Sequence, residues 1–522
     1  MSSPPKEDHA QRVCSTCKQR KKGCDKKLPI CGYCAKRGLS CNYYDNDSGI
    51  LFGPAPSKDG VVGISLPAWQ RQRLSQAEGT SNFITPLLQL GPFNTPLLPI
   101  SGLSTIDETV YQHVRSIYQS LRLTFHEAST RFFQNFQNWL PIITPERLYQ
   151  AIVAAECRIP SADLSILLLS ICLVTTRLHD EAPIQATGPA SLYVLIKTLY
   201  AQVQAMTQAS TLLTQAGLVV SAYEYASGQL DSAYVSIGAC ARMGHTIGID
   251  NAGDRLAESH ADAESRLDVM EQWNLWWGII ILERFILLEM SPSRYKHITA
   301  ACPTCNISLP SDIICEGELG LSYDEMQMCL PTSGHSHNSF GRQAQTVYIL
   351  DQTLRIINSP TTPERRLWEL AKLDSKLQDD LMQLMEERSY ANGLRCGAAA
   401  TVIRSLYLLH QDIIAHATTL APIATREQWK RRSEAALDTA SKIMMDVAEH
   451  HLNHISHHGV DSLHFCCGCN LRVAIRYIQS RCNDGCGEDV FFVNGLEKLT
   501  LLERAFRERW GSPRSEISQY GV

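Results

Sequence analysis

Six cysteines near the N-terminus have a spacing that suits metal binding. The pattern C-x2-C-x6-C occurs twice with an offset of 17 residues, at Cys14, Cys17, Cys24, Cys31, Cys34 and Cys41. Zinc prefers four ligands in a tetrahedron, so two zinc ions need eight ligand positions. Because only six thiolates are present, two of them must bridge both ions, and the repeat favours equivalent ones. We expect Cys14 and Cys31, the first cysteine of each half, to bridge.

These expectations define two ligand sets. One zinc ion would be bound by Cys14, Cys17, Cys24 and Cys31, and the other by Cys31, Cys34, Cys41 and Cys14. A segment of 28 residues has no usable apolar core, so metal binding has to supply its folding free energy. We expect a short helix after the first cysteine of each half, ended by Gly23 and Gly38 respectively.

The segment between the first and sixth cysteines is strongly basic. It holds eight Lys or Arg residues and one acidic residue, and the basic run lies in the first half, at Lys18, Arg20, Lys21 and Lys22. With six thiolates and two Zn²⁺ the module still carries a charge of about +5. A short helix that carries this basic run would suit the major groove of DNA, with contacts to phosphates and guanine edges. The alternatives are a structural zinc module and a nuclear-import signal at residues 18–27.

The segment Cys14–Cys41 resembles the Zn2Cys6 binuclear cluster of fungal transcription factors, of the galactose-regulator type. The resemblance rests on the six cysteines, the basic run and Pro29 in the connecting loop. It implies that the partner is double-stranded DNA with CGG-type triplets and that a helix enters the major groove. Arg20 and Lys21 match the family's adjacent basic pair, which contains its base-reading lysine. Lys18 and Lys22 are then expected to contact phosphates.

The rest of the chain has the opposite charge. Residues 1–45 hold ten Lys or Arg and four Asp or Glu, so a head of +6 precedes a body of −11. The 522 residues are 44% hydrophobic and 19% charged, as in globular proteins with a large core. No secretory signal and no run of about 20 apolar residues is visible. We therefore expect an intracellular protein with reduced thiols and no membrane partner.

The composition also predicts the domain organisation. Residues 46–104 are expected to be a flexible, disordered linker, since seven prolines fall between Pro54 and Pro99. No heptad repeat follows the cysteines, so a coiled-coil dimer is not expected there. The predicted domains are residues 1–45 (core 14–41) for the DNA-binding module, 46–104 for the linker, and 105–522 for an all-helical regulatory domain.

The pattern beyond Thr105 predicts helices only, so the fold class is mostly α. Thr144 and Thr362 each precede Pro-Glu, which is a helix start signal. The further ranges predicted as helices are Ser161–His179, Leu212–Ala226, Leu230–Gly248, Glu264–Glu289, Pro363–Glu387, Ala398–Thr418, Arg426–His451 and Asp461–Ser480.

Three stretches of the body resemble the fungal-specific transcription factor middle region. They are Phe132–Ile143, Ala233–Gly248 and Glu271–Arg284. The resemblance covers roughly residues 110–310 and implies a regulatory domain that contacts partners or small effectors. The tryptophans of this region, Trp273, Trp276 and Trp277, are expected to be core anchors.

Two further groups have alternative interpretations. Cys302 and Cys305 form a C-x2-C pair that is either redox-active or part of a plain loop. The stretch between His450 and Cys486 is rich in His and Cys and is either a second metal or redox site or a polar helix end with buried thiols. No nucleotide-binding, hydrolase or metalloprotease motif is present, so we expect no enzyme and no catalytic residues.

Together these patterns predict a nuclear, sequence-specific DNA-binding regulator of RNA polymerase II genes that acts with the transcription machinery. By analogy with the family we expect control of one metabolic gene cluster, such as a secondary-metabolism cluster. The alternative is an effector-binding or enzymatic helical protein with an accessory structural zinc module. The sequence leaves open whether the protein activates or represses, and whether it is a monomer or a homodimer formed through the helical body.

Overall fold

The computed structural model describes residues 13–27, 30–39, 41, 43–44, 51–52, 105–176, 189–258, 263–290, 300–303, 309–311, 339–387, 396–417, 423–482 and 490–511. These residues fall into two compact units, one within residues 1–80 and one within residues 81–522. Most of the predicted linker, together with Pro29, Cys305 and Cys486, lies outside the described residues.

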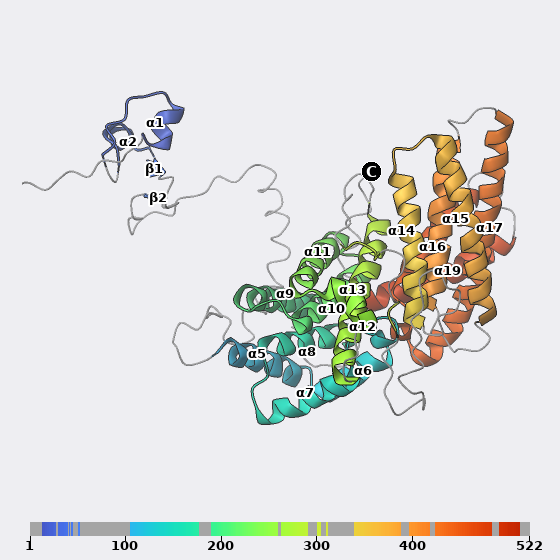
Figure 1. The fold of residues 1–522 in the computed structure, drawn as a ribbon, viewed down its shortest axis with the longest axis horizontal. Helices are drawn as coiled ribbons and strands as arrows, with labels where there is room; N and C mark the ends of the chain where they lie inside the picture. The colour runs from blue at the N-terminus through green and yellow to red at the C-terminus, as the bar shows by residue number, and fades with distance from the viewer. Residues whose placement is uncertain are drawn as a thin grey trace, which may run out of the picture. The chain divides into compact units, whose positions relative to one another are not determined.

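The N-terminal unit contains two short helices of equal length and a small antiparallel sheet (Figure 1). Helix α1 spans Ser15–Gln19 and α2 spans Gly32–Lys36. Strands β1 (Tyr43–Tyr44) and β2 (Leu51–Phe52) pair with Tyr43 opposite Phe52. The two helices follow the internal repeat of the sequence, because each begins directly after the first cysteine of its half.

Helix α2 ends as predicted, at a glycine with a left-handed backbone. Gly38 has a φ of 59°, and the Gly38 amide donates to the carbonyl of Ala35. The next amide, that of Leu39, donates to the carbonyl of Cys34 over 3.0 Å. This pair of bonds satisfies carbonyls that the last helical turn leaves without partners.

Helix α1 ends at Gln19 and is followed by the left-handed Lys21, so the prediction that Gly23 ends it is wrong. The Lys21 amide donates to the carbonyl of Lys18, the Lys22 amide donates to that of Cys17, and Lys21 has a φ of 49°. The repeat explains the difference, because an offset of 17 residues equates Gly38 with Lys21 and not with Gly23. A left-handed backbone costs a non-glycine residue roughly 1–2 kcal/mol.

All regular secondary structure among the described residues of the larger unit is helical (Figure 1). Its first part comprises α5 (Ile106–Ser120), α6 (Phe125–Gln134), η1 (Phe136–Asn138), α7 (Pro145–Cys157), α8 (Ala162–Thr175), α9 (Pro189–Met206), α10 (Thr211–Ala226), α11 (Leu230–Ile247), η2 (Ile249–Asn251), α12 (Ala252–Glu258) and α13 (Ala263–Glu289). Helices α10 and α11 pack against each other and form the predicted hairpin.

The core of this part surrounds α8, α10 and α13. Every side chain of α8 except that of Asp163 is buried, which is typical of a helix packed on all sides. The tryptophans Trp273, Trp276 and Trp277 of α13 are at most 2% exposed, which confirms their prediction as core anchors. The predicted start of α7 is also confirmed, with Thr144 as N-cap and Pro145 at the first helical position.

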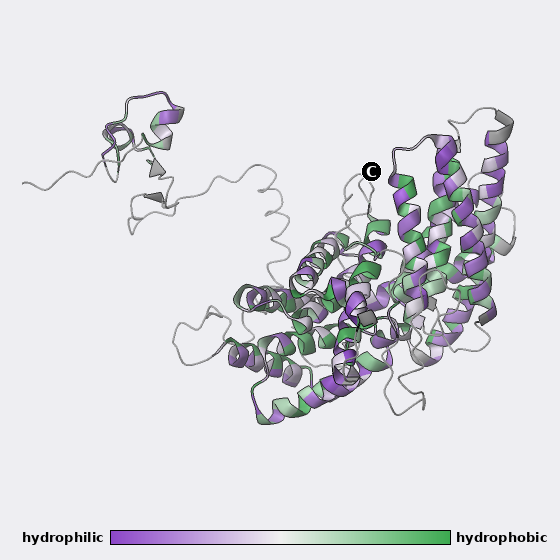
Figure 2. Ribbon diagram, viewed as in Figure 1, coloured by the Kyte–Doolittle hydropathy of each residue, from purple (hydrophilic) through white to green (hydrophobic). Residues whose placement is uncertain are grey.

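The second part of the unit contains α14 (Ser339–Asn358), α15 (Pro363–Glu387), α16 (Cys396–Ala417), α17 (Ile423–His458), η4 (Val460–Ser462), α18 (Cys466–Arg481) and α19 (Val490–Trp510). Hydrophilic residues recur along α15 and α17 (Figure 2). Helices α5, α6, α9, α12, α14 and α19 have no counterpart among the predicted ranges. Helix α18 begins later than predicted, because Gly459 and the extended Leu463 flank a separate 3-10 turn.

Ion pairs, most of them buried, join α13 to the helices of the second part. Arg284 donates to Asp351 of α14 over 2.8 Å, and neither side chain is more than 2% exposed. Glu289, the last residue of α13, lies 3.3 Å from both Arg404 of α16 and Arg472 of α18. The two parts of the body therefore share one packed and hydrogen-bonded interior.

Among the described residues, no single helix has both the length and the apolar character needed to cross a membrane. Within the same residues, helices α7 and α8 taken together are long and apolar enough, but the two helices are bent by 116° relative to each other.

Candidate metal centre and nucleic-acid interface

The two halves of the N-terminal unit present their cysteines in the same way. Cys14 and Cys31 cap α1 and α2, and their sulfur atoms accept hydrogen bonds of 3.4 Å from the amides of Cys17 and Cys34. The second cysteine of each half therefore lies in the first helical turn, with its sulfur beside that of the capping cysteine. Cys24 and Cys41 return to the cluster after the left-handed turn that ends each helix.

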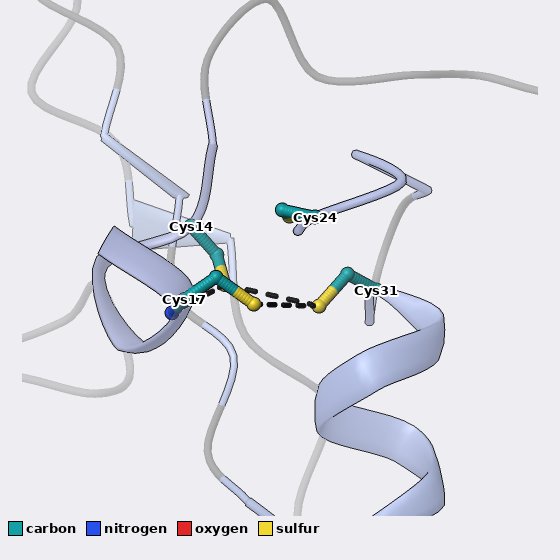
Figure 3. Close-up of side chains that lie close together, drawn as sticks. All are labelled: Cys14, Cys17, Cys24 and Cys31. Carbon is teal, nitrogen blue, oxygen red and sulfur yellow. Dashed lines mark hydrogen bonds between the residues drawn. The ribbon is translucent and has the colours of Figure 1, made fainter. Parts of the chain in front are cut away.

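The six sulfur atoms form two groups of four. One group is Cys14, Cys17, Cys24 and Cys31, the other is Cys14, Cys31, Cys34 and Cys41, and within each group the sulfur atoms lie within 4.8 Å of one another. Cys14 and Cys31 belong to both groups. Figure 3 shows the sulfur atoms of Cys14, Cys17 and Cys31 facing one another.

The sulfur geometry fits zinc. The Cys14 and Cys31 sulfur atoms are 3.8 Å apart, and those of Cys17 and Cys31 are 3.6 Å apart. With Zn–S bonds of about 2.3 Å, the sulfur atoms of a tetrahedral site lie roughly 3.8 Å apart. A site of four thiolates with no open position is characteristic of structural rather than catalytic zinc.

Burial makes the thiolates dependent on a cation. Burial raises the pKa of Cys17 and of Cys34 to about 12, and it raises the pKa of Cys14 further. Burial alone would also raise the pKa of Cys31, but hydrogen bonds from the Cys34 amide and neighbouring thiols lower it to about 6. A coordinating metal ion deprotonates its thiol ligands, so two Zn²⁺ ions would remove this penalty.

The predicted DNA-contacting residues occupy different parts of the first half. Lys18 lies in the last turn of α1, Arg20 is its C-cap residue, Lys21 has the left-handed backbone, and Lys22 follows. All four side chains are exposed. The corresponding arginine of the second half, Arg37, lies over the ring of Tyr33 at 5.5 Å.

Sequence reasoning missed two features of this unit. It did not find the left-handed backbone of Lys21, although the repeat aligns that lysine with Gly38. It also assigned no role to Asp25, whose carboxylate accepts from the backbone amide of Gly32. The signal for Asp25 was its position as the one acidic side chain between Cys14 and Cys41.

The other candidate sites do not assemble in the described part of the chain. The two cysteine groups above are the only sets there of three or more Cys, His, Asp or Glu residues close enough to bind a metal. Cys302 is buried, with its sulfur 3.7 Å from Arg284. In the His- and Cys-rich stretch, His454 bonds Ser462 and His464 is buried among aromatic rings. The described residues of that stretch therefore support buried thiols and a helix end.

Comparison with known proteins gives one family match in the N-terminal unit and two relatives of the chain. Residues 12–49 match the family model described as the fungal Zn(2)-Cys(6) binuclear cluster domain. Transcription factor BOA15 of Botryotinia fuckeliana is 26% identical over 125 residues, which are 24% of this chain and 67% of that protein. Sterol uptake control protein 2 of Candida albicans is 30% identical over 109 residues, which are 18% of this chain and 15% of that protein.

The family match covers the N-terminal unit alone, and each relative matches a quarter of the chain or less. The family match ends at residue 49, and the stretch shared with the Candida albicans protein spans less than two thirds of that relative. The resemblance of residues 110–310 to the fungal-specific middle region therefore stays a prediction.

Proposed function

We propose that this chain, which carries a fungal Zn(2)-Cys(6) binuclear cluster domain with two zinc ions at residues 12–49, is a DNA-binding transcription factor. The observation that carries the proposal is the pair of four-sulfur groups that share Cys14 and Cys31, next to an exposed basic run. The names of both relatives, a transcription factor and a control protein, support it.

In this proposal the six cysteines are the zinc ligands, and Cys14 and Cys31 bridge the two ions. The ions hold two helices that are too short to fold alone and present the basic run as one rigid surface. Lys18 and Lys22 contact phosphates, which provides affinity without sequence preference. Arg20 and Lys21 reach guanine edges of CGG-type triplets in the major groove.

The backbone of Lys21 supports its role in base recognition. Its left-handed conformation is the one that glycine adopts without strain at the equivalent Gly38. A lysine at this point costs local stability, so we infer that its side chain is retained for a contact outside the module.

A gel shift with and without a chelator tests the function. We expect the full chain to bind CGG-containing DNA and to release it when zinc is removed, because the module unfolds without metal. Binding that survives chelation, or no binding to any DNA, would refute the proposal. Probes with one and with two triplets show whether a monomer or a dimer binds.

Single cysteine variants sharpen this test. Cys24→Ala removes one of four sulfur atoms from a zinc site and is expected to abolish zinc-dependent DNA binding. Cys157→Ala is the matched control, since Cys157 is an exposed cysteine of α7, outside both groups. The control should bind DNA like the wild type.

We further propose that the protein acts in the nucleus on RNA polymerase II genes, with the transcription machinery, and controls one metabolic pathway. The name of the Candida albicans relative, which refers to sterol uptake, supports a metabolic target. Expression profiling of a deletion strain tests this. Transcripts of one clustered pathway should change, whereas changes scattered over unrelated genes would contradict a pathway-specific role.

A further inference from the structure

The loop between the third and fourth cysteines is tied to the start of α2 by one carboxylate. Both oxygens of Asp25 accept from the backbone amide of Gly32, over 2.9 Å and 3.0 Å. The Lys27 amide also points to Asp25, over 3.4 Å. The single acidic side chain between Cys14 and Cys41 therefore accepts from backbone donors within the module.

Gly32 allows this close approach because it has no side chain. A Cβ atom at this position would lie 2.6 Å from Oδ2 of Asp25, which is far inside van der Waals contact. Gly23, in the first half, differs, since a Cβ atom there would meet nothing within 4 Å. A side chain at Gly32 would therefore collide with the Asp25 carboxylate and with no other group within 4 Å.

The contact lies directly beside the cysteine that belongs to both sulfur groups. Gly32 follows Cys31 in the chain, and the amide of Cys31 itself donates to the sulfur of Cys41 over 3.2 Å. The backbone amides on both sides of the Cys31 side chain are thus held, one by a sulfur atom and one by Asp25. Groups that hold a metal ligand in place raise metal affinity, because the ligand does not have to be ordered on binding.

We propose that Asp25 and Gly32 form a clamp that positions Cys31 as the shared ligand and slows the release of zinc. Asp25 is a positioning residue in this proposal and does not itself coordinate the metal. The inference rests on the proposed zinc-dependent DNA binding, which it extends to the residues that keep the metal centre assembled.

The clamp is tested in the full, zinc-loaded chain by four variants: Asp25→Ala, Gly32→Ala, the double variant, and Gly23→Ala as the matched control. The measured quantity is the rate of zinc release to an excess of colorimetric chelator. Each of the first two variants should release zinc about 10-fold faster than the wild type. The double variant should be no faster than Asp25→Ala, because the added Cβ then has no carboxylate to displace. Gly23→Ala should match the wild type.

Asp25→Asn separates positioning from a general loss of stability. Asparagine keeps an oxygen at the same place and should restore most of the slow release, whereas alanine should not. Should Gly32→Ala fail to retain zinc at all, the proposal requires that the double variant retain it.

Three results would overturn the clamp. The first is an Asp25→Ala variant that releases zinc at the wild-type rate. The second is a double variant whose release rate is raised by the product of the two single effects. The third is a loss of zinc from both Gly32→Ala and the double variant. DNA binding is measured on the same samples. A wild type that keeps zinc but binds no DNA would refute the proposed function and leave the clamp to be judged by release rates alone.

Discussion

Lys21 occupies a backbone conformation that glycine occupies in the other half of the module. The first helix turns at this residue because Cys24 has to return to the cluster at the point where Cys41 does in the second half. The metal ligands impose the position of this turn, and under the proposed function the lysine is retained there for a contact with DNA. The proposed function therefore predicts that Lys21 serves both the metal centre and the DNA contact.

Replacing Lys21 by glycine should separate these two requirements. Lys21→Gly removes the strain of the left-handed backbone, so zinc retention should be unchanged or better. The affinity for CGG-containing DNA should fall by about 1–3 kcal/mol, together with the preference over scrambled DNA. Fluorescence anisotropy on both probes and a zinc-release assay measure the two effects.

Lys22→Ala is the control for this prediction. A phosphate contact carries no sequence information, so this variant should weaken binding to both probes by the same factor. An unchanged preference in Lys21→Gly would contradict the assignment of Lys21 as a base-reading residue.

His464 is the buried residue of the body with the clearest dependence on pH. Its ring stacks on Phe465 and lies beside Trp139, the amide of Cys466 donates to its Nδ1, and Gln343 lies 2.8 Å from its Nε2. Burial lowers the pKa of His464 to about 3. The folded protein therefore keeps this histidine neutral under conditions where the unfolded chain protonates it.

The pKa of His464 predicts a loss of stability in mild acid. Between an unfolded value of about 6.5 and the folded value, the unfolded state binds one more proton, so stability falls as the pH falls. From pH 6.5 to 5 the loss is about 2 kcal/mol for this group. Urea unfolding of the wild type and His464→Asn at both pH values measures it. The variant should be less stable at pH 6.5 but should lose less on acidification; equal losses in both proteins would contradict the prediction.

Helix α13 shows what decides packing at the scale of an element. Its sequence predicts a long helix with buried tryptophans, but the pattern does not reveal that neighbouring segments reach its backbone. A Cβ atom on Gly278 would lie 2.9 Å from side-chain atoms of both Leu140 and Leu218. The segment before α7 and helix α10 therefore meet α13 at a position where any larger side chain would have to displace them.

Gly278→Ala should destabilise the body although alanine favours helices. The added methyl group has to displace two buried leucine side chains, which costs about 1–3 kcal/mol in a packed core. Gly468→Ala in α18 is the control, since the nearest atom to its Cβ is at 3.5 Å, an ordinary contact. That control should be neutral or up to about 1 kcal/mol more stable. Thermal unfolding followed by circular dichroism compares the two, and a Gly278→Ala variant as stable as the control would contradict this packing.

On the scale of the whole molecule, the two units depend on different sources of stability. The N-terminal unit buries five of its six cysteines and has only Ile30, Tyr33 and Leu39 among its other described side chains to pack against them. The body has a continuous apolar core that extends from α5 to α19. Metal should therefore be needed for one unit and not for the other.

Removal of zinc should abolish DNA binding and leave the body folded. After chelation we expect the helical circular dichroism signal at 222 nm and the unfolding midpoint of the body to stay within error of the zinc-loaded protein. The DNA affinity should fall to the nonspecific level, and added zinc should restore it. A body that melts on chelation would show that its folding depends on the metal after all.

The sequence by itself determined the features that depend on spacing along the chain. The six cysteine positions, the stoichiometric need for two shared thiolates, and the all-helical class follow from local pattern and from valence, and helix starts such as Thr144 follow from capping chemistry. Helices α5, α6, α9, α12, α14 and α19 were not among the predicted ranges.

Only the tertiary structure decided which backbone positions are constrained by distant groups. The left-handed turn at Lys21 arises because Cys24 must reach the same cluster as Cys14 and Cys31. A side chain at Gly32 would have to displace a carboxylate, and one at Gly278 two leucine side chains, and these groups come from elsewhere in the chain. The neutral state of His464 likewise depends on rings from three segments. Such constraints are set by contacts in space, which local sequence patterns do not encode.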